Sequence, residues 1–166
     1  QRKPEEIDLL YADNLTNRTA TSTTGNLQFY HQLSQLVLNL SSSDNTDFSN
    51  LSVTISGVKT KANFNLVDGS LTVDEKSIAT VTMRRVGNAA EAILLPANTI
   101  NGIKLTLTLN GKTKEITLPT SITSLEQGAK HIFSVNIKNG GSQVDPEEGK
   151  YAKWRETPVI TKNMLE

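Results

Sequence analysis

The 166-residue chain contains no cysteine, which excludes disulfides, thiolate metal sites and cysteine nucleophiles. Aromatic residues make up only 5% of the chain, there are two histidines, and 17 basic residues balance 17 acidic ones. Without a net charge, no global field favours nucleic acid or an anionic membrane as a partner. No apolar run is long enough for a signal peptide or a membrane helix, so we expect no membrane insertion by this domain.

Ser, Thr and Asn dominate the polar residues, and this balance suits strands and turns better than helices. A mass of 18.1 kDa fits one domain that buries its own core. Short alternating segments follow one another along the chain, with loops between them and no long amphipathic helix. The pattern predicts an all-β fold, an antiparallel two-sheet β-sandwich.

The most apolar stretch is Leu27–Leu40, LQFYHQLSQLVLNL. Both of its ends alternate with a period of two, typical of a half-buried strand, with Leu27 and Phe29 expected to face inward. Residues His31–Leu40 also fit a helical stripe, so periodicity alone leaves two interpretations open. We favour a central strand with an irregularity near Gln32–Gln35, because the alternating segments downstream offer it sheet partners.

Two alternating segments, 51–55 and 62–66, predict two consecutive strands of an antiparallel meander. Gly57 and Asp68-Gly69 follow them as turn signals. A weakly alternating segment at 78–83 precedes the dibasic pair Arg84-Arg85, which we expect in a solvated loop. Ser124–Gly128 is expected to form one helical turn.

The clearest local signal is a hairpin. Two alternating runs, Ile103–Leu109 and Lys112–Leu118, flank Asn110-Gly111, and both turn positions of such a hairpin need positive φ. A last core strand is predicted around Phe133, Val135 and Ile137.

The chain changes character after Gly141. Residues 145–150, DPEEGK, are typical of a linker, so we expect a β-sandwich domain over 1–141 and a linker with a C-terminal tail over 142–166. The tail is either a final strand of its own domain or a segment that adds to an exposed sheet edge of a neighbouring molecule. The candidate assembly residues are Trp154, Pro158, Val159, Ile160, Met164 and Leu165.

Few residues suggest chemistry. His31 and His131 belong to no motif with a nucleophile, so each is interpreted as a core or edge histidine held by a hydrogen bond. Asp44–Asp47 lacks the spaced ligands of a calcium loop and is interpreted as a solvated turn. We therefore predict no catalytic residue, no cofactor and no metal site, and an enzyme is the least supported class.

Five segments carry weak motifs whose order and spacing together are informative. They are DLLYA at 8–12, LQFYHQLSQL at 27–36, FNL at 64–66 with Gly69, EAILLP at 91–96, and Gly128 followed by the strand at 132–137. As a set they resemble the fimbrillin family of Gram-negative anaerobic bacteria. The resemblance covers most of the chain.

That resemblance implies transthyretin-like β-sandwich domains with a Greek key, usually two per protein, exported as lipoproteins and matured by proteolysis. It also implies subunits that polymerise by donating a strand to a neighbour. This chain then looks like one domain, the C-terminal one, of a longer precursor, although it lacks the lipid-bearing cysteine of the family.

Two functions of different classes follow. The first is a structural subunit or adhesion domain of a cell-surface pilus in the fimbrium or outer membrane, with other pilus subunits as partners. The alternative is a carbohydrate- or host-ligand-binding module of an exported lipoprotein, with Tyr30, Tyr151 and Trp154 as stacking residues.

Overall fold

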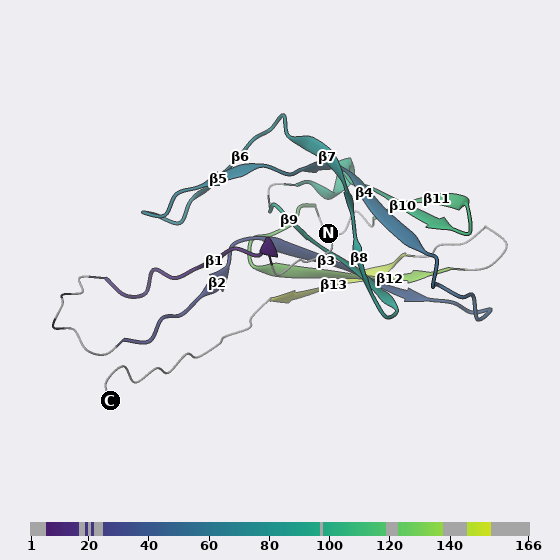
Figure 1. The fold of residues 1–166 in the computed structure, drawn as a ribbon, viewed down its shortest axis with the longest axis horizontal. Coiled ribbons are helices and arrows are strands. Elements are labelled where there is room, and N and C mark those ends of the chain that lie inside the picture. Colours follow the sequence, from purple (N-terminus) through teal and green to yellow (C-terminus); the bar gives the residue numbers. More distant parts are fainter. Residues whose placement is uncertain are drawn as a thin grey trace.

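The computed structural model describes residues 6–16, 19, 21, 25–96, 98–118 and 123–137, and the backbone of 146–153. In this part of the chain the fold is all-β, as predicted, with two main sheets packed face to face (Figure 1). The described residues contain no helix long and apolar enough to cross a membrane.

The larger sheet has five strands in the order β13-β12-β3-β9-β8. Its strands are β3 (Ser34–Ser41), β8 (Arg84–Val86), β9 (Ala89–Leu94), β12 (Ala129–Asn136) and β13 (Pro146–Lys153). The smaller sheet has four strands in the order β11-β10-β4-β7. Its strands are β4 (Ser52–Lys59), β7 (Ile78–Thr82), β10 (Lys104–Leu109) and β11 (Lys112–Thr117).

Two short hairpins and a 3₁₀ turn are also part of the described fold. The pairs are β1 (Leu10–Tyr11) with β2 (Tyr30–His31), and β5 (Ala62–Phe64) with β6 (Leu71–Val73), and the 3₁₀ turn spans Ile100–Gly102. Both hairpins lie at the same end of the sandwich (Figure 1).

Strand β3 is the centre of the larger sheet, which confirms the predicted central strand. Its residues Leu36, Leu38 and Leu40 are all buried and face the second sheet, as a period of two requires. The predicted irregularity is also present, because the strand is interrupted at Gln32-Leu33 between β2 and β3. The inward orientation of Leu27 was wrong, since 48% of its surface is exposed.

The core lies between the sheets and takes alternate residues from both. In β12 every second residue from Ala129 to Val135 is buried, and in β4 and β10 the same alternation buries Val53 and Leu105. Each sheet therefore gives one apolar face to a shared core.

One pairing departs from the antiparallel prediction. β12 runs parallel to β3, with Phe133 opposite Leu38, while the other described pairs are antiparallel. Between β3 and β12 the chain visits the smaller sheet twice, and so long a connection allows the returning strand to enter in either direction. The transthyretin-like Greek key stays a prediction.

The predicted meander of consecutive strands was wrong. β4 pairs with β7 and β10, whereas β5 pairs with β6 in a separate hairpin. Gly57, interpreted as a turn, lies inside β4 with a φ of +79°, where the register with β7 shifts between Ile55 and Val58. A glycine at positive φ is as typical of a β-bulge as of a turn, and here it marks a bulge.

Two smaller predictions were also wrong. Residues 124–128 form a bridge and a turn in place of a helical turn, with Ser124 bridged to Thr99. Arg84 and Arg85 lie in β8 and not in a solvated loop. The guanidinium of Arg85 donates hydrogen bonds to the carbonyl oxygens of Phe48, Leu51 and Gly87, which ties the 42–51 loop to the β8–β9 turn.

Residues 146–153 form β13, paired antiparallel with β12, so the linker interpretation was wrong for Pro146–Lys150. The strand pairs Lys153 with Ala129. The wider division of the chain at residue 141 stays a prediction.

The predicted Asn110-Gly111 hairpin is confirmed, with φ values of +49° and +79°. Replacing Gly111 by Val should lower the free energy of unfolding by about 1–2 kcal/mol, because a β-branched residue resists positive φ. Thermal unfolding of Gly111→Val beside Thr113→Val, an exposed strand position of the same hairpin, measures the effect. An unchanged midpoint in Gly111→Val would contradict the turn assignment.

Candidate assembly site

Tyr11 joins the two short hairpins at one end of the sandwich. Its ring meets the edge of the Phe64 ring, with centroids 5.3 Å apart and planes at 75°. The Tyr11 hydroxyl donates a hydrogen bond to the carbonyl oxygen of Leu66, at 3.3 Å. A side chain at Gly69 would collide with the same tyrosine ring, whose nearest carbon lies 2.6 Å from the ideal Cβ position. β1 and the β5–β6 hairpin are therefore packed against each other.

The segment before β1 is held by His31. The Nδ1 atom of His31 lies 2.9 Å from a carboxylate oxygen of Asp8, and both side chains are mostly buried. The Gln32 backbone N–H donates to the Leu9 carbonyl oxygen at 2.8 Å. His31 is thus an edge histidine held by a hydrogen bond, as predicted, and it fixes the N-terminal segment against β2.

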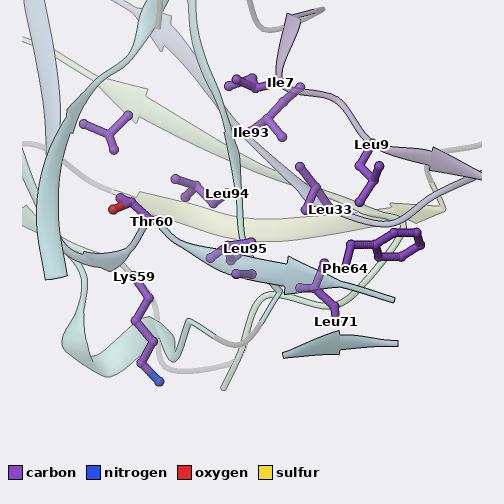
Figure 2. Close-up of a pocket in the computed structure, with 12 residues that line it drawn as sticks. Ile7, Leu9, Leu33, Lys59, Thr60, Phe64, Leu71, Ile93, Leu94 and Leu95 are labelled. Atoms are coloured by element: carbon purple, nitrogen blue, oxygen red, sulfur yellow. The ribbon is translucent and has the colours of Figure 1, made fainter. Parts of the chain in front are cut away.

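An apolar groove of about 440 Å³ lies between this N-terminal segment and the β5–β6 hairpin. Side chains from both sides point into it (Figure 2). One wall is formed by Leu9, Leu33, Ile93 and Leu94, and the other by Phe64 and Leu71. A concave, mostly apolar pocket of this size is the usual shape of a binding site for a small molecule or for side chains of another segment.

The polar groups at the groove are already engaged. The Lys59 ammonium lies 2.5 Å from the Glu75 carboxylate, and the Thr60 hydroxyl donates to the Ser77 carbonyl oxygen. Within the described ranges, no three His, Cys, Asp or Glu side chains are placed to hold a metal ion. The groove is therefore suited to apolar side chains rather than to a charged ligand.

The two edges of the smaller sheet differ in charge. β11 carries Lys112, Lys114 and Glu115, and charged side chains along an edge discourage pairing with another chain. β7 carries no charged residue, and Ile78 on it is 64% exposed. Of the two edges, β7 is the better template for an added strand.

His131 has a different role from His31. It is fully buried in β12, and its Nε2 atom accepts a hydrogen bond from the Glu126 backbone N–H at 3.1 Å. Burial lowers the pKa of His131 from its ordinary value of 6.5, with an opposing effect from the Glu126 carboxylate. The imidazole is thus held neutral as a hydrogen-bond acceptor at the start of the strand.

The lowered pKa predicts a pH-dependent stability. Below pH 6.5 the unfolded chain binds a proton at His131 that the folded chain resists, so the free energy of unfolding should fall as the pH decreases. One such group contributes a slope of up to about 1.4 kcal/mol per pH unit. Denaturant unfolding between pH 7 and pH 5 measures it, and His131→Gln, which keeps an acceptor and cannot titrate, should show a shallower slope. Equal slopes would contradict the assignment.

All six predicted assembly residues, Trp154, Pro158, Val159, Ile160, Met164 and Leu165, lie outside the described residues. Of the proposed stacking residues, Tyr30 is exposed in β2, Tyr151 lies in β13 with its backbone alone described, and Trp154 lies outside. The groove was missed by sequence reasoning, because its lining comes from segments far apart in the chain and no local pattern joins them.

Comparison with known proteins gives the family. The model of the fimbrillin-like family matches residues 1–154. The chain belongs to this family. A protein of Bacteroides uniformis assigned as fimbrium subunit Fim1C is 25% identical to this fimbrillin-like chain over 154 residues. The match covers 87% of the chain and 51% of the relative, so the chain spans about half the length of that protein.

Solved structures agree with the fold of this fimbrillin-like domain. A protein of Bacteroides uniformis assigned to cell adhesion superposes with a TM-score of 0.77 at 25% identity, covering 90% of this chain and 61% of that one. The tip fimbrial protein Mfa3 of Porphyromonas gingivalis superposes with a TM-score of 0.51 over 89% of this chain and 70% of its own. At 10% identity, the second likeness concerns the fold alone.

Proposed function

We propose that this domain is a structural subunit or adhesion domain of a bacterial cell-surface pilus, and that it assembles by strand donation. The observation that carries the proposal is the family match over residues 1–154, together with a relative assigned as a fimbrium subunit. Its partners are then other pilus subunits, and its place is outside the cell, in the fimbrium or at the outer membrane. No catalysis is part of this role.

Two physical features support strand donation. The segment after β13 carries the apolar residues Val159, Ile160 and Leu165, which need a surface that excludes water. The β7 edge has backbone groups beside uncharged side chains, where an added strand gains main-chain hydrogen bonds. Pro158 fits the start of such a strand, because proline cannot donate to a ladder.

The alternative is a carbohydrate- or host-ligand-binding module. It is favoured by the exposed Tyr30, 45% of whose surface is accessible, since an exposed aromatic ring is a stacking platform. Among the aromatic side chains that the structure describes, Tyr30 alone is exposed, and the others are buried or half-buried. A platform with a single ring is a weaker basis than the family match.

Immunogold labelling of cells that express the full precursor tests the pilus role. Gold along surface filaments is the expected result, with the filaments lost when the gene is deleted. Diffuse label on the cell surface without filaments, together with glycan binding that is abolished in Tyr30→Ala, would support the alternative.

A chain that ends at Lys153 tests strand donation, since it keeps β13 and removes residues 154–166. The truncated chain should fold with a nearly unchanged melting midpoint and should no longer be incorporated into filaments. Substitution of Arg155 by Ala in the untruncated chain is a control that leaves the apolar residues in place. Filaments formed normally by the truncated chain would contradict donation by the tail.

A further inference from the structure

We propose that the tip of the β5–β6 hairpin is a contact surface for a basic amphipathic segment of a partner protein. Three side chains form this surface, the apolar tip: Leu66, Val67 and Tyr30. The contact is separate from the pilus role, since it involves neither residues 154–166 nor the β7 edge. Exposure, turn geometry and charge all point to it.

The apolar tip is exposed to solvent. Leu66 and Val67 have 78% and 91% of their surface accessible, the two highest values among the large apolar side chains that the structure describes. Tyr30 lies beside them, because it pairs across the β1–β2 ladder with Tyr11, whose hydroxyl donates a hydrogen bond to the Leu66 carbonyl oxygen. Isolated exposed apolar residues are ordinary, whereas a group of them at one place marks an interaction surface.

A hydrogen-bonded turn fixes the backbone of the apolar tip. The Asn65 Oδ1 atom accepts from the Val67 N–H, and the Asp68 Oδ1 atom accepts from the Ser70 N–H, both at 2.9 Å. The Asn65 N–H also donates to the Ser70 carbonyl oxygen. Asparagine and aspartate form such turns readily, because their short side chains reach the backbone two residues on. A surface that is ordered before contact loses less conformational entropy when a partner binds.

The hairpin holds the apolar tip away from the core. β5 and β6 form a sheet of their own, and they extend past the two main sheets (Figure 1). The side chains of the apolar tip do not line the groove, so a partner on the tip is distinct from any occupant of the groove. A convex pair of apolar side chains packs well against one face of an amphipathic segment, which removes apolar surface of both from water.

The charges around the apolar tip are negative. Among the residues of the two hairpins that the structure describes, the carboxylates are Asp13 and Asp68, and no lysine or arginine is present. Arg18 lies outside the described residues. Hydrogen bonds from the Ser70 hydroxyl and backbone N–H lower the pKa of Asp68 from its ordinary value of 3.8, so this carboxylate is charged at neutral pH.

Negative charge beside apolar side chains selects the kind of partner. Lysine or arginine side chains on the partner are attracted, and such complementarity adds specificity to an apolar contact. Anionic lipid headgroups are repelled. A second copy docked tip to tip would bring two Asp68 carboxylates together, which is also unfavourable. A protein segment with both apolar and basic residues therefore fits best.

Fluorescence anisotropy with a labelled peptide tests the contact. The probe is an amphipathic helical peptide built from leucine and lysine, and the protein is the full 166-residue chain. Leu66→Ser combined with Val67→Ser should weaken binding by about 10-fold or more, because two apolar side chains leave the interface. Ile78→Ser is the matched control, since Ile78 is 64% exposed on β7, outside both hairpins, and its replacement should change Kd by less than about 2-fold.

The charge preference is tested with the same peptide carrying glutamate in place of lysine, and with Asp68→Asn. Asparagine keeps a side-chain oxygen for the Ser70 N–H, so the change removes the charge and retains the turn. The glutamate peptide should bind the parent chain about 10-fold more weakly or worse. Asp68→Asn should weaken binding of the lysine peptide by about 2- to 5-fold.

The proposal is overturned if the double variant binds the lysine peptide as tightly as the parent chain, if the glutamate peptide binds equally well, or if the lysine peptide does not bind. Val67→Ser alone, at the more exposed position, repeats the test should the double variant unfold, with an expected loss of about 3-fold. Binding to phosphatidylcholine vesicles in place of the peptide, lost in the same variants, would make the tip a membrane contact and would also overturn the proposal.

These outcomes are separate from those of the pilus role. Peptide binding by the purified chain would stand even if the protein formed no filaments. Conversely, filaments that need residues 154–166 could form even if no peptide bound to the apolar tip.

Discussion

Replacing Asn98 by Ala should lower the free energy of unfolding by about 3 kcal/mol, although Asn98 lies in a loop. Its side chain is 2% exposed and makes three hydrogen bonds to backbone. Its Oδ1 atom accepts from the Lys59 N–H at 2.7 Å, and its Nδ2 atom donates to the carbonyl oxygens of Lys59 and Leu95. Alanine would remove the acceptor of the Lys59 N–H at the end of β4 and the side-chain bonds to the Lys59 and Leu95 carbonyl oxygens, although the backbone N–H of residue 98 still donates to Leu95.

Chemical denaturation measures this change, with Asn101→Ala as the control. Asn101 is an exposed asparagine three residues further on, in the 3₁₀ turn, and its replacement should cost less than about 0.5 kcal/mol. Equal stability of the two variants would show that Asn98 does not hold the end of β4. Asn98 also bears on the groove, because Lys59 and Leu95, which it holds, both line it.

Gly57→Ala should be at least as damaging, with an expected loss of about 3 kcal/mol or more. Two causes act together. The φ of +79° is costly for any residue with a Cβ, and the added methyl would lie well inside contact distance of the Gly102 carbonyl oxygen. The backbone atom cannot move aside without disturbing the 3₁₀ turn, Ile100–Gly102.

Gly111→Ala separates these causes. Gly111 has the same φ of +79°, but a Cβ there would meet nothing within 4 Å. Its replacement should therefore cost only the backbone term, about 1 kcal/mol. A loss in Gly57→Ala no greater than in Gly111→Ala would contradict the close approach of β4 to Gly102.

Local patterns predicted the elements well. The alternation at Leu36, Leu38 and Leu40 placed one face of β3 in the core, and Asn110-Gly111 fixed a hairpin, because each signal depends on residues that are neighbours in the chain. The all-β class followed from many such segments taken together.

Partners of strands could not be predicted in the same way. The alternation of apolar and polar residues in β4 and β5 predicts that each strand turns one face inward. It does not predict that β4 pairs with β10, some 50 residues away. The same holds for the parallel pairing of β12 with β3. Gly57 was misinterpreted because a bulge and a turn make the same demand on φ.

The same contrast between local pattern and long-range contact holds for the candidate site. From its composition the tail was predicted to be either a final strand of its own domain or an assembly segment, since Val159 and Ile160 are apolar residues beyond the last predicted core strand. The groove could not be predicted, because Leu9, Leu33 and Leu71 come together only when the two short hairpins pack at one end of the sandwich. An apolar tail can be recognised from the sequence alone, whereas the apolar groove can be recognised only from the folded structure.

Photo-cross-linking from residue 160 in assembled filaments tests the central claim most directly. A photoreactive group at this position is activated in filaments harvested from cells, and the products are separated under denaturing conditions. Strand donation predicts covalent products that contain two subunits, because the tail of one subunit lies in contact with the next. If residue 160 links only to its own chain in intact filaments, the tail does not join subunits and the account is wrong.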